Sequence, residues 1–134
     1  MARLLYVGDY GTSVDPIALR RSLGAAQVSN RRRDVSGVYC YSESGFIEVL
    51  EGAPEEAEAA MERCLRSGIP RQLRLLHRDT VTRRQFDGWV AMPIVRSELS
   101  DLVQECISVP TLEAKQIERM VKLLCLDTEF DSRY

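Results

Sequence analysis

The chain has 134 residues, of which 45% are hydrophobic and 28% are charged, and its formal net charge at pH 7 is −2. These values are typical of one soluble globular domain, and the weakly acidic balance argues against a general nucleic-acid binder. No apolar stretch approaches the length of a membrane span and no signal-peptide pattern opens the chain, so we expect a cytoplasmic protein without membrane contact.

The cysteine and histidine content argues against a metal site. The four cysteines show no C-x-x-C spacing and each has apolar neighbours: Cys40, Cys64, Cys106 and Cys125. We interpret them as buried, reduced packing residues rather than metal ligands or disulfides. His77 is the only histidine, which excludes a histidine-based metal cluster or a Cys–His nucleophile pair.

The first two predicted elements are a strand and a helix. Residues 4–8 alternate as in a strand that is buried on both faces. Asp15 and Pro16 are typical of a helix start, as the N-cap and the first helical residue. The apolar stripe of this helix consists of Leu19, Leu23 and Ala26. We expect the helix to end near Asn30.

A β-hairpin follows. Residues 35–41 are β-branched and aromatic and predict the second strand, and the turn at 42–45 leads into a third strand over 45–52. Period-2 alternation places Phe46, Glu48 and Leu50 on one face of the third strand. Its other face is also apolar, so this strand is expected to be covered on both sides.

Glu48 is the most informative residue of the chain. An ionised carboxylate among core-facing neighbours is costly unless it has a partner. We therefore expect a ligand, a hydrogen-bonding tyrosine or a raised pKa at this position. The alternative is a frayed strand that lets the carboxyl group of Glu48 reach solvent.

The second half of the chain predicts one more helix and two more strands. A second helix opens at residues 53–56, with acidic residues at its positive end, and stops at 67–70. Its predicted buried stripe is Ala57, Ala60, Met61, Cys64 and Leu65. Residues 72–76 and 89–95 predict the fourth and fifth strands.

The element order predicts an α+β fold. The order β-α-β-β-α-β-β is typical of a ferredoxin-like sheet with two helices on one face. The other face needs a cover, and the tail offers two amphipathic segments separated by Pro110. Their apolar residues are Leu99, Leu102, Val103, Cys106 and Ile107, and then Ile117, Met120, Val121, Leu124 and Cys125. We therefore expect a core over residues 1–95 and a C-terminal helical cap of the same domain over residues 96–134.

Several of these elements together resemble the BLUF family, the flavin-binding blue-light sensors. The resemblance lies in residues 4–6, in Asn30, in the strands at 36–42 and 45–52, and in residues 83–89. It covers about residues 1–95, and the two tail helices resemble the cap of short BLUF proteins.

The resemblance implies a flavin site. The cofactor would be FAD, with FMN as the alternative, and its ring would insert between the two helices on the sheet. Asn30 would bond the pyrimidine edge of the ring, Arg63 would help to hold that side, and Ser29 lies at a neighbouring cofactor position. Tyr6 would be the redox-active tyrosine, with Glu48 as its photochemical partner.

Glu48 departs from the family pattern, because this position normally carries glutamine. In the family's photochemistry an electron and a proton move between tyrosine and flavin, and the glutamine amide then rearranges. An ionised glutamate only accepts hydrogen bonds, whereas a protonated one has a single donor. Because burial raises a carboxyl pKa, we expect Glu48 to be substantially protonated when flavin is bound.

Trp89 and Met92 are the expected signal-output residues. The family often shows Trp-x-Met, whereas this chain has Val90 and Ala91 between the two residues. Ala91 therefore takes the methionine register, and Met92 points to the opposite face unless a bulge intervenes.

The sequence thus predicts a flavin-binding photoreceptor that is not an enzyme, that forms a homo-oligomer and that signals to a separate protein effector. Its photocycle would be atypical because of Glu48. One alternative is a degenerate BLUF-like interaction module without flavin or light response. A third interpretation, an acylphosphatase-like hydrolase that uses an arginine and an asparagine, has no Gly-rich phosphate loop to support it.

Overall fold

The computed structural model describes residues 1–109 and 112–132, with side chains of the last helix up to residue 126. The elements in chain order are β1 (Ala2–Asp9), α1 (Pro16–Arg32), β2 (Ser36–Tyr41), β3 (Gly45–Gly52), α2 (Pro54–Arg66), β4 (Gln72–Thr80), β5 (Trp89–Pro93), α3 (Ser97–Ser108) and α4 (Ala114–Ser132). This order confirms the predicted α+β succession. The predicted break at Pro110 lies outside the described residues.

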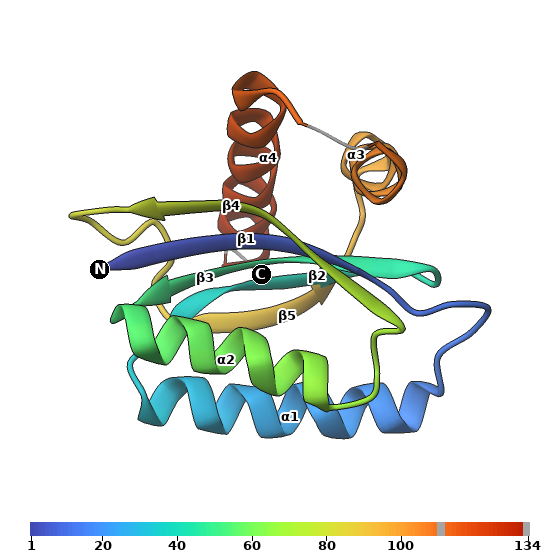
Figure 1. Cartoon of the computed structure of the whole chain (residues 1–134), viewed down its shortest axis with the longest axis horizontal. Coiled ribbons are helices and arrows are strands. Elements are labelled where there is room, and N and C mark those ends of the chain that lie inside the picture. Colours follow the sequence, from blue (N-terminus) through green and yellow to red (C-terminus); the bar gives the residue numbers. More distant parts are fainter. Residues whose placement is uncertain (110–111, 133–134) are drawn as a thin grey trace.

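The five strands form one sheet in the order β4-β1-β3-β2-β5. Strand β1 lies antiparallel to both β3 and β4, β2 lies antiparallel to β3, and β5 adds to β2 in parallel. Helices α1 and α2 cover one face of the sheet, and α3 and α4 lie over the other (Figure 1). The ferredoxin-like arrangement with a helical cap is therefore confirmed. No described helix is long and apolar enough to span a membrane.

Local sequence signals account for the start of α1. The Asp15 carboxylate accepts a hydrogen bond from the backbone N–H of Ile17 at 3.0 Å, and Pro16 occupies the first turn. The helix continues to Arg32, slightly beyond the predicted end. Two strands differ in length from the prediction. Strand β4 continues beyond the predicted end at residue 76 to Thr80, because it pairs with the whole of β1, whereas β5 ends at Pro93 and not at residue 95.

Strand β3 separates two apolar cores, and every one of its residues is buried. Phe46 and Leu50 belong to the core under α1 and α2, whereas Ile47 and Val49 belong to the core under the cap. The predicted two-sided burial is confirmed. Glu48 stands on the face that α1 and α2 cover, next to both core residues of that face.

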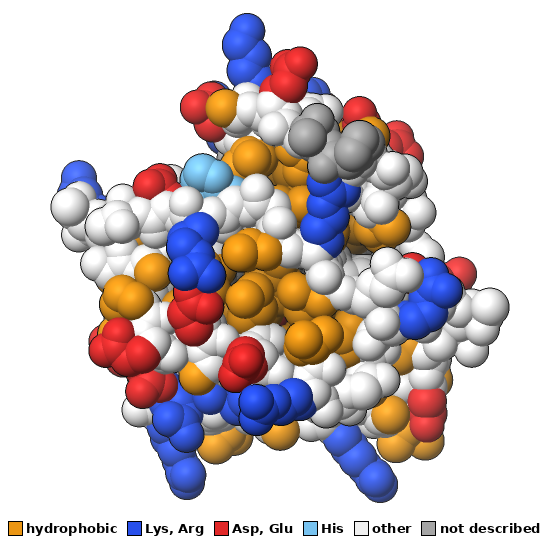
Figure 2. Space-filling view, in the orientation of Figure 1, with side chains coloured by type: hydrophobic (Ala, Val, Ile, Leu, Met, Phe, Trp, Pro, Cys, Tyr) orange, Lys and Arg blue, Asp and Glu red, His pale blue; other side chains and the backbone are white. Residues whose placement is uncertain are grey.

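One side-chain prediction needs correction. Leu65 was expected in the buried stripe of α2, but it is 52% exposed, because α2 packs on β1 and β3 through Ala57 and Ala60. Leu75 on the edge strand β4 is also exposed. Figure 2, in the orientation of Figure 1, shows hydrophobic side chains gathered in the middle of the visible face of the molecule.

The four cysteines are not all buried. Cys40 and Cys106 are buried, whereas Cys64 and Cys125 are only half-buried, and no disulfide joins them in the described part of the chain. The Cys106 sulfur lies 3.5 Å from the sulfur of Met120, inside the core under α3 and α4. This pair joins the two cap helices.

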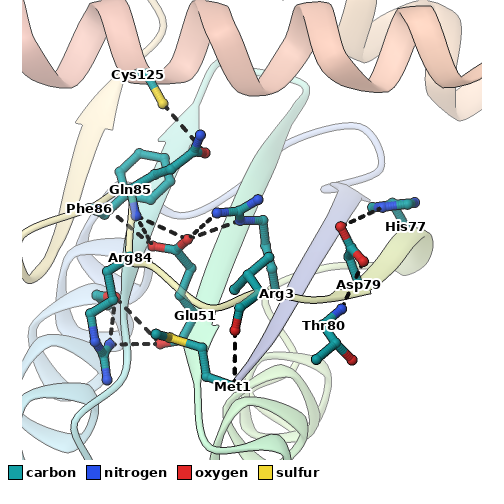
Figure 3. Close-up of polar contacts among 12 residues, drawn as sticks. Met1, Arg3, Glu51, His77, Asp79, Thr80, Arg84, Gln85, Phe86 and Cys125 are labelled. Carbon is teal, nitrogen blue, oxygen red and sulfur yellow. Dashed lines mark hydrogen bonds and ion pairs between the residues drawn. The ribbon is translucent and has the colours of Figure 1, made fainter.

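A second buried carboxylate, on Glu51, fixes the loop between β4 and β5 (Figure 3). Its Oε2 accepts hydrogen bonds from Nε and Nη2 of Arg3 at 2.9 and 2.8 Å. Its Oε1 accepts from the backbone N–H groups of Gln85 and Phe86 at 3.0 and 3.1 Å. Glu51 therefore joins β1, β3 and this loop through charged hydrogen bonds.

Replacing Glu51 with alanine is expected to lower the free energy of unfolding by about 3 kcal/mol, because it leaves Arg3 and two backbone donors without their acceptor. Urea unfolding followed by circular dichroism would measure the change. Glu43→Ala, at an exposed turn position, is the control and is expected to stay within about 0.5 kcal/mol of the wild type. Equal effects of the two substitutions would contradict the role of Glu51.

Candidate functional site

A cavity of about 260 Å³, partly open to solvent, lies on the sheet face that α1 and α2 cover. Its lining comes from both helices and from β2, β3 and β5: Ser22, Leu23, Ala25, Ala26, Ser29, Asn30, Tyr39, Glu48, Ala60, Arg63, Cys64, Ser67, Ile69 and Trp89. The size is close to the lower end of small-molecule pockets, about 300 Å³. Apolar walls with a few polar groups suit a ligand whose polar atoms lie at its edge.

Glu48 lies on the floor of this cavity and is only 3% exposed. Its neighbours across the sheet are Tyr6 on β1 and Tyr39 on β2. The Tyr6 hydroxyl donates a hydrogen bond to Oε1 of Glu48, and the Trp89 indole N–H donates to Oε2 at 2.8 Å. The alternative of a frayed strand with a solvent-exposed Glu48 is therefore wrong.

Burial raises the pKa of the Glu48 carboxyl to about 7, although the hydrogen bonds from Tyr6 and Trp89 act in the opposite direction. Both donors are neutral, and neutral donors offset only part of the cost of removing a carboxylate from water. Glu48 therefore titrates in the physiological range.

Tyr6 is not among the residues that line the cavity, and its place beside a bound ring stays a prediction. Its side chain is fully buried, because α2 packs over β1, and its ring meets Phe46 edge to face. Burial, followed by the nearby Glu48 carboxylate, raises the pKa of Tyr6 well above its ordinary value. Tyr6 is thus a neutral phenol, and the hydrogen bond from its hydroxyl to Glu48 connects it to the cavity.

Three other predicted binding residues do line the cavity: Ser29, Asn30 and Arg63. The backbone carbonyl of Asn30 accepts from Val35 N–H at 2.9 Å, but its carboxamide bonds no residue in the described part of the chain. Nη2 of Arg63 is buried and also has no hydrogen-bond partner among the described residues. A buried guanidinium nitrogen without a partner is costly, and a hydrogen-bond acceptor inside the cavity would compensate this cost.

Trp89 and Met92 lie on opposite faces of the sheet. Trp89 belongs to the core under α1 and α2, whereas Met92 belongs to the core under the cap. Strand β5 pairs with β2 in parallel, residue by residue and without a bulge, so that Ala91 lies opposite Tyr39. The structure therefore confirms the register expected from the sequence, with Met92 turned away from the cavity.

The sequence interpretation missed Tyr39 and Cys64 as cavity residues. Tyr39 could have been found from the hairpin, because the tight turn between β2 and β3 fixes the register that sets Tyr39 opposite Glu48. Cys64 was assigned to packing, and helical spacing alone does not show that its thiol borders a cavity.

One comparison with known proteins identifies a family. The family model described as sensors of blue-light using FAD, BLUF, matches residues 1–92. No curated protein matches the chain.

Three solved structures show the same fold. BlsA in its photo-activated state has a TM-score of 0.75 at 17% identity, over 92% of this chain and 94% of that one. BlrP1 of Klebsiella pneumoniae gives 0.67 at 18%, over 95% of this chain and 34% of that one. A bacterial light-regulated adenylyl cyclase gives 0.63 at 16%, over 99% of this chain and 36% of that one.

The raised pKa of Glu48 predicts a pH-dependent stability. The carboxyl ionises near pH 4.3 in the unfolded chain and at about 7 in the folded one, so only the folded chain keeps the proton between these values. The stability of the wild type should therefore fall by about 3 kcal/mol as the pH rises from about 5 to above 7.

Glu48→Gln provides the comparison, because an amide does not titrate. Urea unfolding of both flavin-free proteins at several pH values is expected to show the wild type losing stability relative to Glu48→Gln as the pH rises. A difference that stays constant from pH 5 to pH 8, which are about the limits of this window, would contradict the raised pKa.

Proposed function

The chain belongs to the BLUF family, and on this premise we propose that it binds flavin between α1 and α2 and senses blue light through Glu48. The observation that carries the proposal is a cavity with Glu48 on its floor and an unpartnered, buried Arg63 nitrogen on its wall. The family description names FAD, and we propose FAD as the cofactor, with FMN as the alternative.

The polar residues of the cavity suit the pyrimidine edge of a flavin. That edge carries carbonyl acceptors and an N–H donor. Arg63 can only donate, whereas the Asn30 carboxamide can donate and accept. Together with Ser29, these side chains would hold the edge of the ring and orient it over Glu48.

Tyr6 and Glu48 would form the photochemical pair. When bound, the flavin supplies a light-excited electron acceptor. Tyr6, which hydrogen-bonds Glu48, would release an electron, and the Oε1 atom of Glu48 is the position that can take its proton. With a pKa of about 7, Glu48 is protonated in part of the molecules and ionised in the rest near neutral pH. The ionised fraction would accept the proton better than an amide does, so this photocycle would differ from that of glutamine-containing members.

Trp89 limits where a proton on Glu48 can reside. The indole N–H only donates, so Oε2 of Glu48 remains an acceptor in both protonation states. A protonated Glu48 would therefore carry its proton on Oε1 and donate it to the Tyr6 oxygen or to the ring. This reversal of one hydrogen bond takes the place of the amide rearrangement.

Strand β5 would carry the signal from the cavity to the cap. Trp89 contacts Glu48 on one face, and Met92 packs in the core under α3 and α4 on the other. In the proposed division of the chain, residues 1–95 form the core and residues 96–134 form the cap. A displacement of Trp89 would thus shift Met92 against the cap. We propose that a protein effector, or a second copy of the chain, contacts the exposed surface of the cap.

A degenerate module without flavin remains the second candidate, and one observation favours it. Both oxygens of Glu48 have protein donors, so its carboxyl group needs no ligand. Incubation of the purified protein with flavin, followed by blue illumination, tests the two functions. A reversible spectral change supports the photoreceptor, and a colourless protein that no flavin reconstitutes supports the module.

Arg63→Ala is expected to weaken flavin binding about 10- to 100-fold, which corresponds to the loss of one charged hydrogen bond. Arg66→Ala is the matched control, because Arg66 lies on the same helix but is exposed and pairs with Glu62. Fluorescence quenching of added flavin would measure both affinities. Equal affinities of the two variants would argue that Arg63 does not face the ligand.

The absorption spectrum of the bound flavin in the dark is expected to change as the pH passes through about 7, because Glu48 gains or loses a proton beside the ring. Glu48→Gln should give a spectrum that is constant over the same range. A wild-type spectrum that does not respond to pH would exclude titration of Glu48 near neutrality.

A further inference from the structure

Tyr39 is a second phenol at the cavity, and it is more directly placed than Tyr6. It lines the cavity with Glu48 and Trp89, whereas Tyr6 is enclosed behind Glu48. Its ring stacks on Phe46 with the ring centroids 4.4 Å apart. The two tyrosines flank Glu48 from opposite sides across the sheet.

The Tyr39 hydroxyl has its own proton route. It shares a hydrogen bond with the Tyr10 hydroxyl at 2.8 Å, and both groups are buried. Tyr10 in turn lines a second, more open cavity formed by residues 9–15 with Gly68, Ile69 and Arg71. The pair of phenols therefore connects the proposed flavin cavity to a solvent-accessible one.

We propose that Tyr39 is a second electron donor to the light-excited flavin, and that its proton leaves through Tyr10 to water in the second cavity. This proposal rests on the proposed flavin binding. Tyr39 loses one electron to the flavin and one proton to the Tyr10 oxygen. Tyr10 passes its own hydroxyl proton to water, and Tyr39 is left as a neutral radical.

The two phenols differ in the acceptor for their proton. Tyr6 hydrogen-bonds the Glu48 carboxyl, so its proton stays next to the ring. Burial, followed by Tyr10, raises the pKa of Tyr39 above its ordinary value, so its phenol holds its proton until it is oxidised. Oxidation of Tyr39 therefore moves the proton away from Glu48 and leaves the hydrogen bonds of Glu48 unchanged. Tyr39 would compete with the signalling reaction of Tyr6.

Removing Tyr6 isolates the contribution of Tyr39. In flavin-loaded Tyr6→Phe, transient absorption after blue excitation is expected to show a tyrosyl radical and rapid quenching of flavin fluorescence. Adding Tyr39→Phe should abolish the tyrosyl signal. Adding Tyr41→Phe instead should keep it, because Tyr41 lies on the same strand and does not line the cavity.

Tyr10→Phe tests the proton route. Added to Tyr6→Phe, this substitution removes the hydroxyl next to Tyr39. It is expected to slow formation of the Tyr39 radical and to reduce the solvent deuterium isotope effect on the rate of that formation.

The outcomes separate the two proposals. Loss of the tyrosyl signal in Tyr6→Phe alone, or a tryptophanyl radical from Trp89 in its place, would overturn the role of Tyr39 while flavin binding stands. A wild-type protein that takes up no flavin would overturn both proposals. Flavin content, measured first from absorbance, distinguishes these cases.

Discussion

The carboxyl group of Glu48, buried in the middle of the sheet, constrains the whole face that α1 and α2 cover. A carboxyl group in such a place needs donors, and it has them in Tyr6 on β1 and Trp89 on β5. Because β1 and β5 lie on opposite sides of β3, this one group fixes the positions of two aromatic side chains. The floor of the cavity is therefore a hydrogen-bonded unit, and a proton on Oε1 of Glu48 would reverse the contact with Tyr6 while Oε2 still accepts from Trp89.

The same strand carries a second buried carboxylate with a different partner. Glu51 faces the Arg3 guanidinium and two backbone N–H groups, which compensate a negative charge. Glu48 faces only neutral donors, so burial raises its pKa toward neutral pH. Glu51 thus serves the stability of the fold, and Glu48 is the group that can respond to a proton or a ligand.

Strand β5 connects the two faces of the sheet. Its residues alternate, so that Trp89 lies at the cavity and Met92 lies under the cap. In the proposed function, rearrangement of hydrogen bonds at Glu48 would reach α3 and α4 through these two side chains.

Local patterns in the sequence predicted the element order, the two-sided burial of β3 and the opposite directions of Trp89 and Met92, because alternation and capping act between near neighbours. They failed at Leu65, whose exposure depends on how α2 is rotated on the sheet. They also failed to separate Tyr6 from Tyr39, since the cavity wall is set by where α1 and α2 lie over the strands. The sequence by itself determined that an acid stands at a core-facing position of a strand. Only tertiary packing decided that this acid is buried beside Tyr6 and that Tyr39 lines the cavity, because burial under a helix depends on residues that are far apart in the chain.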